Sequence, residues 1–182
     1  GGSPFNVAVG LARLAQPSAF LSAVSSGFLG DRLMRALAEE KVDTSTVVRT
    51  PARTTISLIG LDARGVPSYD FYGEGAADRQ LGMAAIAALP AGIRAIHVGS
   101  YATVVEPVAA TQRALIEREH GRTVISYDPN LRFNVEPDGA KWRAMLAFML
   151  PRTHLLKISD EDLGLLMPDA TPEAFAAEAL AA

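Results

Sequence analysis

The second half of the chain alternates between short apolar runs and helix-length segments, and this alternation limits the fold more than any other feature. Three runs are typical of buried strands: residues 94–100 (RAIHVGS), 123–129 (TVISYDP) and 154–159 (HLLKIS). Helical patterns follow them at residues 106–120, 138–150, from 160 and from 172. Repeated strand–helix units of this length predict an α/β domain whose parallel sheet is flanked by helices on both faces.

The first half has the same character but is interrupted by a β-rich segment. Residues 5–15 are predicted to form a helix with two apolar stripes, which indicates burial on most sides. A short strand is expected within 19–24 and a helix over 29–40. Residues 54–73 contain two β-rich runs around the turn Asp62-Ala63-Arg64-Gly65 and predict a hairpin. We place this hairpin in an inserted segment, residues 43–75, that forms a small β lid.

Composition excludes several classes of function. The net charge is −3, from 17 basic and 20 acidic residues in no basic stripe, so nucleic-acid binding is not expected. The chain has no Cys, which excludes disulfides and thiolate catalysis. No apolar run approaches the roughly 20 residues that span a bilayer, so we expect no membrane partner and a cytoplasmic location.

Polar residues follow the predicted strands where a parallel sheet binds its ligands. Ligands of such sheets bind beyond the carboxyl ends of the strands. The corresponding segments here are GSY (99–101), YDPNLR (127–132) and KISDEDL (157–163), and the glycine pair Gly1-Gly2 before the first helix is a fourth candidate. We expect a binding site where these segments meet.

Each candidate segment also has a purely structural interpretation. Gly1, Gly2 and Asn6 either bring a helix start close to a hydroxyl-rich ligand or form an ordinary glycine turn. Asp128 and Arg132 either pair with each other, or Arg132 reaches an anionic ligand.

The acidic segment after residue 158 has a strong structural interpretation. Ser159 is a good helix N-cap, and the acids that follow it complement the helix dipole. The functional alternative places an acid near Mg²⁺ bound to phosphates. The three histidines, at 97, 120 and 154, show no metal-ligand spacing, and Trp142 is expected to pack rather than to stack on a ligand.

Several segments together resemble the ribokinase-like (PfkB) carbohydrate kinases, and the fructokinase branch in particular. GGSPFNVAVGLARLA resembles the first signature of that family, and FLSAVSSGFLGDRLMRALAEEKVDTSTV resembles its next strand, loop and helix. TTISLIGLDARGVPSYDFYGEGAADRQL resembles its substrate lid, while YDPNLR and LLKISDEDL resemble the fructokinase type. The resemblance covers essentially the whole chain and implies a ribokinase-like fold.

The resemblance implies transfer of the γ-phosphoryl group of ATP to a sugar hydroxyl, with ATP and Mg²⁺ as cofactors. It implies that Gly1, Gly2, Asn6, Arg132 and one of the lid aromatics, Phe71 or Tyr72, bind the sugar. It assigns the nucleotide and its phosphates to the set Asp128, Asn130, Lys157 and Ser159. The family motif N-x-x-E corresponds to Ser159-Asp160-Glu161-Asp162, which gives Asp162 an indirect role at the metal. Pairing of exposed lid edges is expected to allow a homodimer.

Two parts of the family pattern do not occur in these 182 residues. One is an acidic sugar ligand before the glycine pair. The other is D-T-x-G-A-G-D, which carries the catalytic base, so no residue of this chain is assigned as catalytic. The start lacks Met and the end stops inside an amphipathic pattern, so we expect a fold incomplete at both ends. We therefore expect no useful kinase activity from the chain alone.

Two alternatives remain open at this point. One is a kinase of the same fold for 2-keto-3-deoxygluconate or a nucleoside. An acid sugar needs cations, and Arg132 supplies one, but Gly73 offers no second cation beside Tyr72. The other alternative is a non-catalytic sugar-binding or interaction module.

Overall fold

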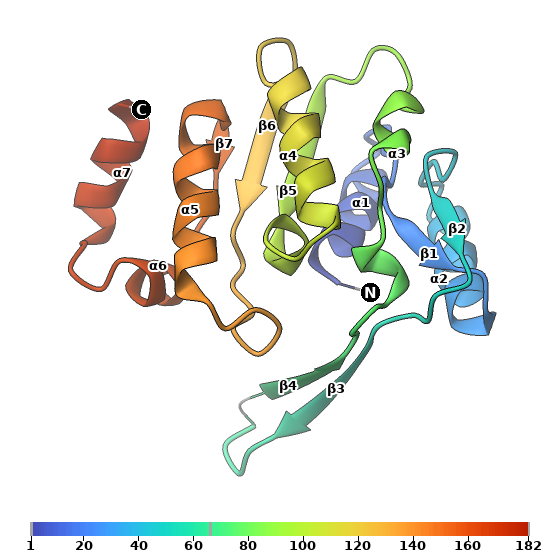
Figure 1. The fold of residues 1–182 in the computed structure, drawn as a ribbon, viewed down its shortest axis with the longest axis horizontal. Helices are drawn as coiled ribbons and strands as arrows, with labels where there is room; N and C mark the ends of the chain where they lie inside the picture. The colour runs from blue at the N-terminus through green and yellow to red at the C-terminus, as the bar shows by residue number, and fades with distance from the viewer. Residues whose placement is uncertain (1, 66, 182) are drawn as a thin grey trace. The chain divides into compact units, whose positions relative to one another are not determined.

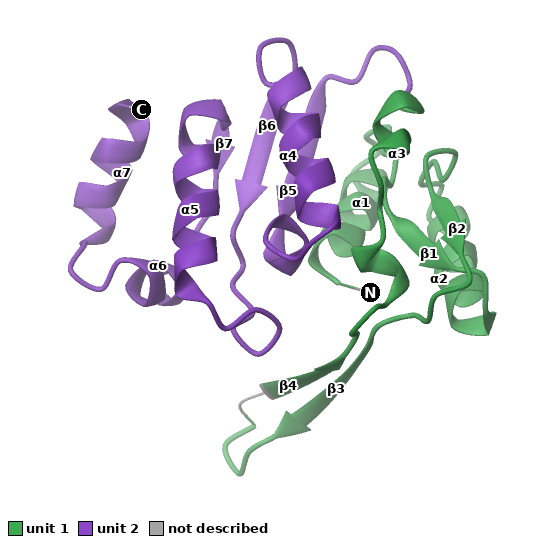
Figure 2. Ribbon diagram, in the orientation of Figure 1, with its two compact units in different colours: residues 1–89 green, residues 90–182 purple. Residues whose placement is uncertain are grey.

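The computed structural model describes residues 2–65 and 67–181 of the chain (Figure 1). They divide into two compact units, the first within residues 1–89 and the second within 90–182 (Figure 2). Gly1, one of the predicted sugar ligands, lies outside the described residues. The elements of the first unit are α1 (Ser3–Arg13), β1 (Ala23–Ser25), α2 (Phe28–Glu39), β2 (Val48–Thr50), β3 (Ile56–Leu61), β4 (Pro67–Tyr72), the 3-10 turn η1 (Ala77–Arg79) and α3 (Ala84–Ala87).

A small parallel sheet and two helices form the body of the first unit. β1 pairs with β2 in parallel, and Gly30 of α2 lies against the backbone of Ser25 in β1. Helix α1 contributes Ala8 to a core that also contains Leu37 and Val42. Phe5, Val9 and Ala12 of the same helix stripe pack against this core, together with Phe20.

The second apolar stripe of α1 is not buried. Leu11 is 40% exposed and Leu14 is 73% exposed. The prediction that α1 is buried on most sides is therefore wrong for the described chain. The reason is geometric: the core contacts only one side of the cylinder, and residues three or four positions apart share that side.

The predicted hairpin is confirmed. β3 and β4 pair antiparallel through six residue pairs, from Ile56 opposite Tyr72 to Leu61 opposite Pro67. At the turn the Asp62 carboxylate accepts the amide of Arg64 at 2.8 Å, and Gly65 takes a φ of +78° that favours glycine. We call residues 56–72 the hairpin. The hairpin forms the later part of the predicted insert at 43–75, and the earlier part of that insert includes β2.

The second unit is built on a three-stranded parallel sheet in the order β5-β6-β7. Its elements are β5 (Ala95–Gly99), the 3-10 turn η2 (Ser100–Thr103), α4 (Val108–Glu119), β6 (Val124–Asp128), α5 (Gly139–Met149), the 3-10 turn η3 (Leu150–Arg152), β7 (Leu155–Leu156), α6 (Asp160–Leu166) and α7 (Pro172–Ala181). These elements match the predicted strand–helix order, although β7 is shorter than the predicted run. Residue 97 of β5 pairs with residue 126 of β6, and residue 127 pairs with residue 156 of β7.

One continuous core holds the second unit together. Ile125 and Tyr127 of β6 project into it beside Val98 of β5, and α4 and α5 lie over this side of the strands (Figure 1). Trp142 of α5 is 1% exposed and donates its indole N–H to the carbonyl oxygen of Glu136 at 2.9 Å. Its predicted packing role is confirmed.

Together the elements form the predicted α/β architecture, with parallel strands flanked by helices and one antiparallel hairpin. Among residues 2–65 and 67–181, no helix has the length and apolar character needed to cross a membrane.

Candidate functional site

The carboxyl ends of β5, β6 and β7 converge as the sequence predicts. Gly99, the last residue of β5, is paired with Asp128, the last residue of β6. A Cβ atom on Gly99 would lie 2.3 Å from the carbonyl oxygen of Asp128, so only glycine fits at this strand end. The backbone amide of Lys157, just after β7, donates to the carbonyl oxygen of Tyr127 at 3.0 Å.

Two neighbouring strand ends continue into left-handed backbone at non-glycine residues. Ser100 follows β5 with a φ of +59°, and Asn130 follows β6 with a φ of +41°. Such conformations are sparsely populated outside glycine and gather at functional sites. Ser100 is buried, whereas Asn130 is partly exposed beyond the buried Pro129.

Two of the predicted phosphate-binding residues are in contact here. The Lys157 ammonium lies 3.2 Å from the Asp128 carboxylate, and this ion pair links the ends of β6 and β7. Lys157 remains 64% exposed, so its charge is accessible to solvent. Ser159 caps α6, because its hydroxyl oxygen accepts the amide of Asp162 at 3.1 Å, as the structural interpretation predicts.

Asp162 and Arg132 both form hydrogen bonds with the backbone of Leu131. The buried Asp162 carboxylate accepts the Leu131 amide at 3.2 Å, and the Arg132 guanidinium donates to the Leu131 carbonyl oxygen at 2.6 Å. Sequence reasoning did not find the Asp162 bond, because the acceptor and donor are 31 residues apart and the donor is a backbone group. The Lys157–Asp128 pair was also missed. The β6–β7 register brings these two side chains together. A prediction of how β6 and β7 align would therefore have identified the pair.

His97 is in β5, two residues before its carboxyl end, and its side chain is on the face of the sheet opposite the core. Its Nδ1 lies 3.1 Å from the Ser126 hydroxyl on the neighbouring strand. Burial lowers the pKa of His97, although the nearby Asp128 charge partly offsets the effect. The His97 ring therefore connects β5 to β6 through this contact with Ser126.

Gly2 and Asn6 lie at the start of α1 in the first unit. Gly2 has a φ of +109° and precedes a helix start that has no side-chain cap among the described residues. The backbone amide of Asn6 donates to the Gly2 carbonyl oxygen at 2.9 Å, and Asn6 is exposed. The backbone therefore has the open helix start that the sequence predicts.

The hairpin separates its two candidate aromatics. Neighbouring strand residues face opposite sides, so Phe71 and Tyr72 cannot both face one ligand. Phe71 stacks on Tyr69, with ring centres 6.3 Å apart. The Tyr72 hydroxyl donates to the Asp70 carboxylate at 3.2 Å, and this hydrogen bond raises the pKa of Tyr72.

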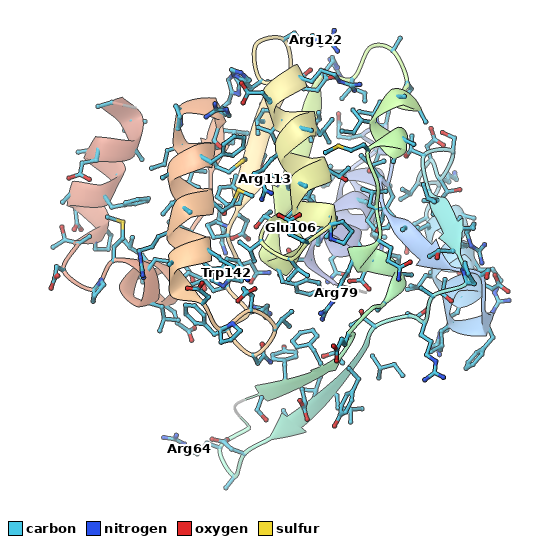
Figure 3. All side chains as sticks on the ribbon, in the orientation of Figure 1. Arg64, Arg79, Glu106, Arg113, Arg122 and Trp142 are labelled. Atoms are coloured by element: carbon cyan, nitrogen blue, oxygen red, sulfur yellow. The ribbon has the colours of Figure 1, made fainter. Side chains whose placement is uncertain are left out.

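A cation lies at the base of the hairpin, where both strands leave the body of the first unit. The Thr55 hydroxyl donates to the Asp78 carboxylate at 2.5 Å. A Cβ atom on Gly73 would lie 3.0 Å from an Arg79 guanidinium nitrogen, so Arg79 is beside Gly73. Figure 3 shows Arg79 at the base of the hairpin and Arg64 at its tip. Gly73 itself offers no cation, as the sequence predicts, but η1 places Arg79 next to it.

A separate cavity of about 440 Å³ in the second unit is lined by η2, the residues before α4, and helices α4 and α5. Its charged lining residues are matched: Glu106 pairs with Arg113 at 2.5 Å, and Glu136 pairs with Lys141 at 2.6 Å. Figure 3 marks Glu106 and Arg113 beside α4. Because these pairs neutralise each other, the cavity shows no charge that selects a ligand.

A comparison with known protein families identifies the family to which the chain belongs. The sequence profile described as pfkB family carbohydrate kinase matches residues 1–182. The chain belongs to the pfkB family of carbohydrate kinases. The match extends across both units.

Curated relatives in this family are fructokinases. The chain is 35% identical over 163 residues to a fructokinase of Rhizobium leguminosarum bv. trifolii, covering 90% of the chain and 50% of that protein. It is 32% identical over 168 residues to a fructokinase of Klebsiella pneumoniae, covering 91% and 54%. The chain thus spans about half the length of these relatives.

Solved structures of pfkB kinases share the fold. A fructokinase of Xylella fastidiosa superposes with a TM-score of 0.86 at 28% identity, covering all of the chain and 59% of that structure. The fructokinase of Vibrio cholerae O395 in its fructose-, ADP- and calcium-bound form gives 0.83 at 27% identity, again over the whole chain and 59% of that structure. These likenesses establish a ribokinase-like fold for the chain.

Proposed function

We propose that the protein is an ATP-dependent sugar kinase whose substrate is fructose or a closely related ketose. The observation that carries this proposal is the convergence of polar groups at three parallel strand ends in a chain of the pfkB family. Support for the substrate comes from the relatives, which are named fructokinases, one of them with fructose and ADP bound. The γ-phosphoryl group would come from ATP, and catalysis would consist of positioning and charge stabilisation.

We assign the sugar to residues of the first unit, and the family resemblance alone adds Arg132 to this assignment. Gly2 and Asn6 offer an open helix start and an exposed amide side chain, which suit hydroxyl groups. Phe71 or Tyr72 would provide an aromatic contact from the hairpin, closing over the sugar and excluding water. Gly1 belongs to the same assignment through the family resemblance.

We assign the nucleotide phosphates to the strand ends of the second unit. Lys157 provides an exposed ammonium held by Asp128, and Asn130 and Ser159 are on the two loops beside it. An ammonium and neutral hydrogen-bonding groups together suit phosphate oxygens.

Mg²⁺ fits this donor set only as an ion carried by the phosphates. The part of the chain that the structure describes contains no group of three acidic or histidine side chains that could hold a metal. Magnesium on nucleotides needs only one or two protein carboxylates and keeps several waters. We therefore propose that Asp162 acts on the metal through water, and that the ion supplies charge neutralisation when bound.

We also propose that the protein is cytoplasmic and that it dimerises through its hairpin. Four apolar hairpin residues are 46–70% exposed: Ile56, Leu58, Ile59 and Leu61. Exposed apolar strands with free edges favour association. The partners proposed beyond a second copy are the sugar and ATP, with no nucleic acid and no membrane.

One observation favours a second candidate substrate, an acid sugar such as 2-keto-3-deoxygluconate. Arg79 lies beside Gly73 at the base of the hairpin. Guanidinium groups suit a carboxylate through paired hydrogen bonds. A nucleoside kinase and a non-catalytic sugar-binding module remain further alternatives with less support.

Thermal shifts of the 182-residue chain with a ligand panel test the proposal. Because a ligand stabilises the state it binds, fructose and ATP should each raise the Tm, whereas ribose and adenosine should not. Asn6→Ala should abolish the fructose shift and leave the ATP shift intact, while Gln16→Ala, an exposed control at the end of α1, should change neither. A larger shift with 2-keto-3-deoxygluconate than with fructose would favour the acid sugar, and no shift with any sugar would refute the assignment.

Sedimentation of hairpin variants tests the dimer. Leu58→Lys and Ile59→Lys place a charge on opposite faces of the hairpin, and the face that mediates pairing is the one where the charge produces monomers. Leu180→Lys, at a 90% exposed site of α7, is the matched control. A wild-type chain that is monomeric at high concentration would contradict the proposal.

A further inference from the structure

The loop after β6 accepts a restraint from one buried carboxylate that is 31 residues away in the sequence, Asp162. Asp162 is 8% exposed and lies in the first turn of α6, where the Ser159 hydroxyl accepts its backbone amide. Its side chain turns away from that helix and accepts the Leu131 amide at 3.2 Å. One acidic residue thus joins two of the three segments that form the proposed phosphate site.

The hydrogen bond from the Leu131 amide restrains the loop next to its residue of unfavourable backbone conformation. Leu131 directly follows Asn130, whose left-handed φ of +41° is costly for a non-glycine residue. Arg132 follows it, and the Arg132 guanidinium already donates to the Leu131 carbonyl oxygen. The backbone N–H and C=O of Leu131 are therefore both satisfied, and the residue itself is 6% exposed. A buried amide without its acceptor would favour rearrangement of the loop.

We propose that Asp162 is a positioning residue that fixes the loop bearing Asn130 and Arg132 in its ligand-binding conformation. The statement that this conformation binds ligand rests on the proposed function, whereas the restraint itself rests on the hydrogen bond. Asp162 thereby fixes the loop in addition to any contact with a metal. The two roles are separable, because the oxygen of an amide side chain can still accept the Leu131 amide, whereas a neutral amide is a poorer ligand than a carboxylate for Mg²⁺ hydration water.

Three variants of the 182-residue chain test the restraint. Hydrogen exchange followed by NMR measures the Leu131 amide against the Leu163 amide, which donates to the Ser159 carbonyl oxygen within α6. Asp162→Ala should accelerate exchange at Leu131 by about tenfold or more and leave Leu163 unchanged, because only one opening equilibrium is altered. Asp162→Asn should keep the Leu131 rate within about threefold of wild type, because the acceptor is retained. Asp160→Ala, at an exposed acid of the same turn, is the control.

ADP binding measured in EDTA separates positioning from metal binding. Without metal, Asp162→Ala should lower the affinity for ADP by about tenfold, because the variant loses the restraint on the loop. Asp162→Asn keeps the restraint, so its affinity should lie within about threefold of wild type. A metal role alone predicts no effect of either variant in EDTA. A general structural role predicts that Asp162→Asn fails as fully as Asp162→Ala.

The outcomes separate the restraint from the proposed function. Unchanged Leu131 exchange in Asp162→Ala overturns the restraint, and so does an Asp162→Asn variant that behaves like the alanine variant. Faster exchange with unaltered ADP affinity overturns the positioning role. If the wild-type chain does not bind ADP, the proposed nucleotide site fails, and the exchange data alone decide the restraint. Should Asp162→Ala not fold, Asp162→Ser replaces it, because its hydroxyl is too short to reach Leu131.

Discussion

Gly30 of α2 occupies a position where the fold leaves no room for a side chain. A Cβ atom built on it would lie 1.7 Å from the carbonyl oxygen of Ser25, because α2 packs directly on β1. Gly30→Ala must therefore push the helix away from the strand and should destabilise the chain by about 2–4 kcal/mol. Urea unfolding measures this change.

Gly10 is the matched control for that substitution. It is in the helix α1, and a Cβ atom there meets nothing within 4 Å. Gly10→Ala should stabilise the chain by about 0.5–1 kcal/mol, because alanine restricts the unfolded state and favours helix. Equal effects of the two substitutions would contradict the close approach of α2 to β1.

Glu119, at the end of α4, gives the chain a specific acid sensitivity. Arg122 donates two hydrogen bonds to its carboxylate, at 2.8 and 2.9 Å, and Arg118 donates a third at 2.7 Å. These bonds, led by those from Arg122, lower the pKa of Glu119 from 4.5 to about 2. A depressed folded-state pKa stabilises the fold above the ordinary pKa, and this stabilisation is lost as the pH falls from 4.5 toward 2.

Glu119→Gln should therefore reduce stability at pH 7 by about 1–2 kcal/mol, and its difference from wild type should shrink below pH 4.5. Urea unfolding at pH 7, 5, 4 and 3 measures it. Glu117→Gln is the comparison, because the Glu117 side chain that pairs with Arg152 is 57% exposed and should contribute less. A wild-type minus variant difference that stays constant with pH would show that Glu119 does not stabilise through its charge.

At the scale of elements, α6 has a helix cap at the same residue that we propose as a phosphate ligand, Ser159. Ser159→Ala removes the cap that the hydroxyl provides and should destabilise α6 by about 1 kcal/mol. Ser159→Asp retains an acceptor at the cap and should recover that stability, but its charge should repel the phosphates of ADP. Thermal unfolding and ADP titration of both variants distinguish the two roles. ADP affinity unaltered by Ser159→Asp would place the phosphates elsewhere.

Elements and their order were predictable because periodicity is a local property. The hairpin, the strands β5 and β6, and helices α2, α4 and α5 all appear within a few residues of the predicted ranges. Burial of α1 was not predictable, because both of its stripes are apolar and only the packing of Leu37 and Val42 selects one. The same limit applies to the site. Strand ends could be read from the sequence, but the Asp162–Leu131 bond depends on loop conformation.

At the scale of the whole molecule, the chain contains part of the chemistry that its family performs. It spans about half the length of the fructokinases it matches. The described residues provide candidate ligands for sugar and phosphate, at the start of α1, on the hairpin and at the ends of β5, β6 and β7. The family motif D-T-x-G-A-G-D, to which the resemblance assigns the catalytic base and an anion-binding helix start, does not occur among the 182 residues.

We therefore expect the 182-residue chain to bind its ligands but not to turn them over. Phosphoryl transfer needs a base that orients the attacking hydroxyl and donors that stabilise the charge of the transition state, and losing both removes several orders of magnitude in rate. A coupled ADP-release assay with fructose and ATP measures turnover, with the intact Rhizobium leguminosarum fructokinase as positive control. Adding the separately expressed second half of that fructokinase should restore activity if the two halves associate. Turnover by the chain alone near the rate of the intact enzyme would show that its own residues supply the base.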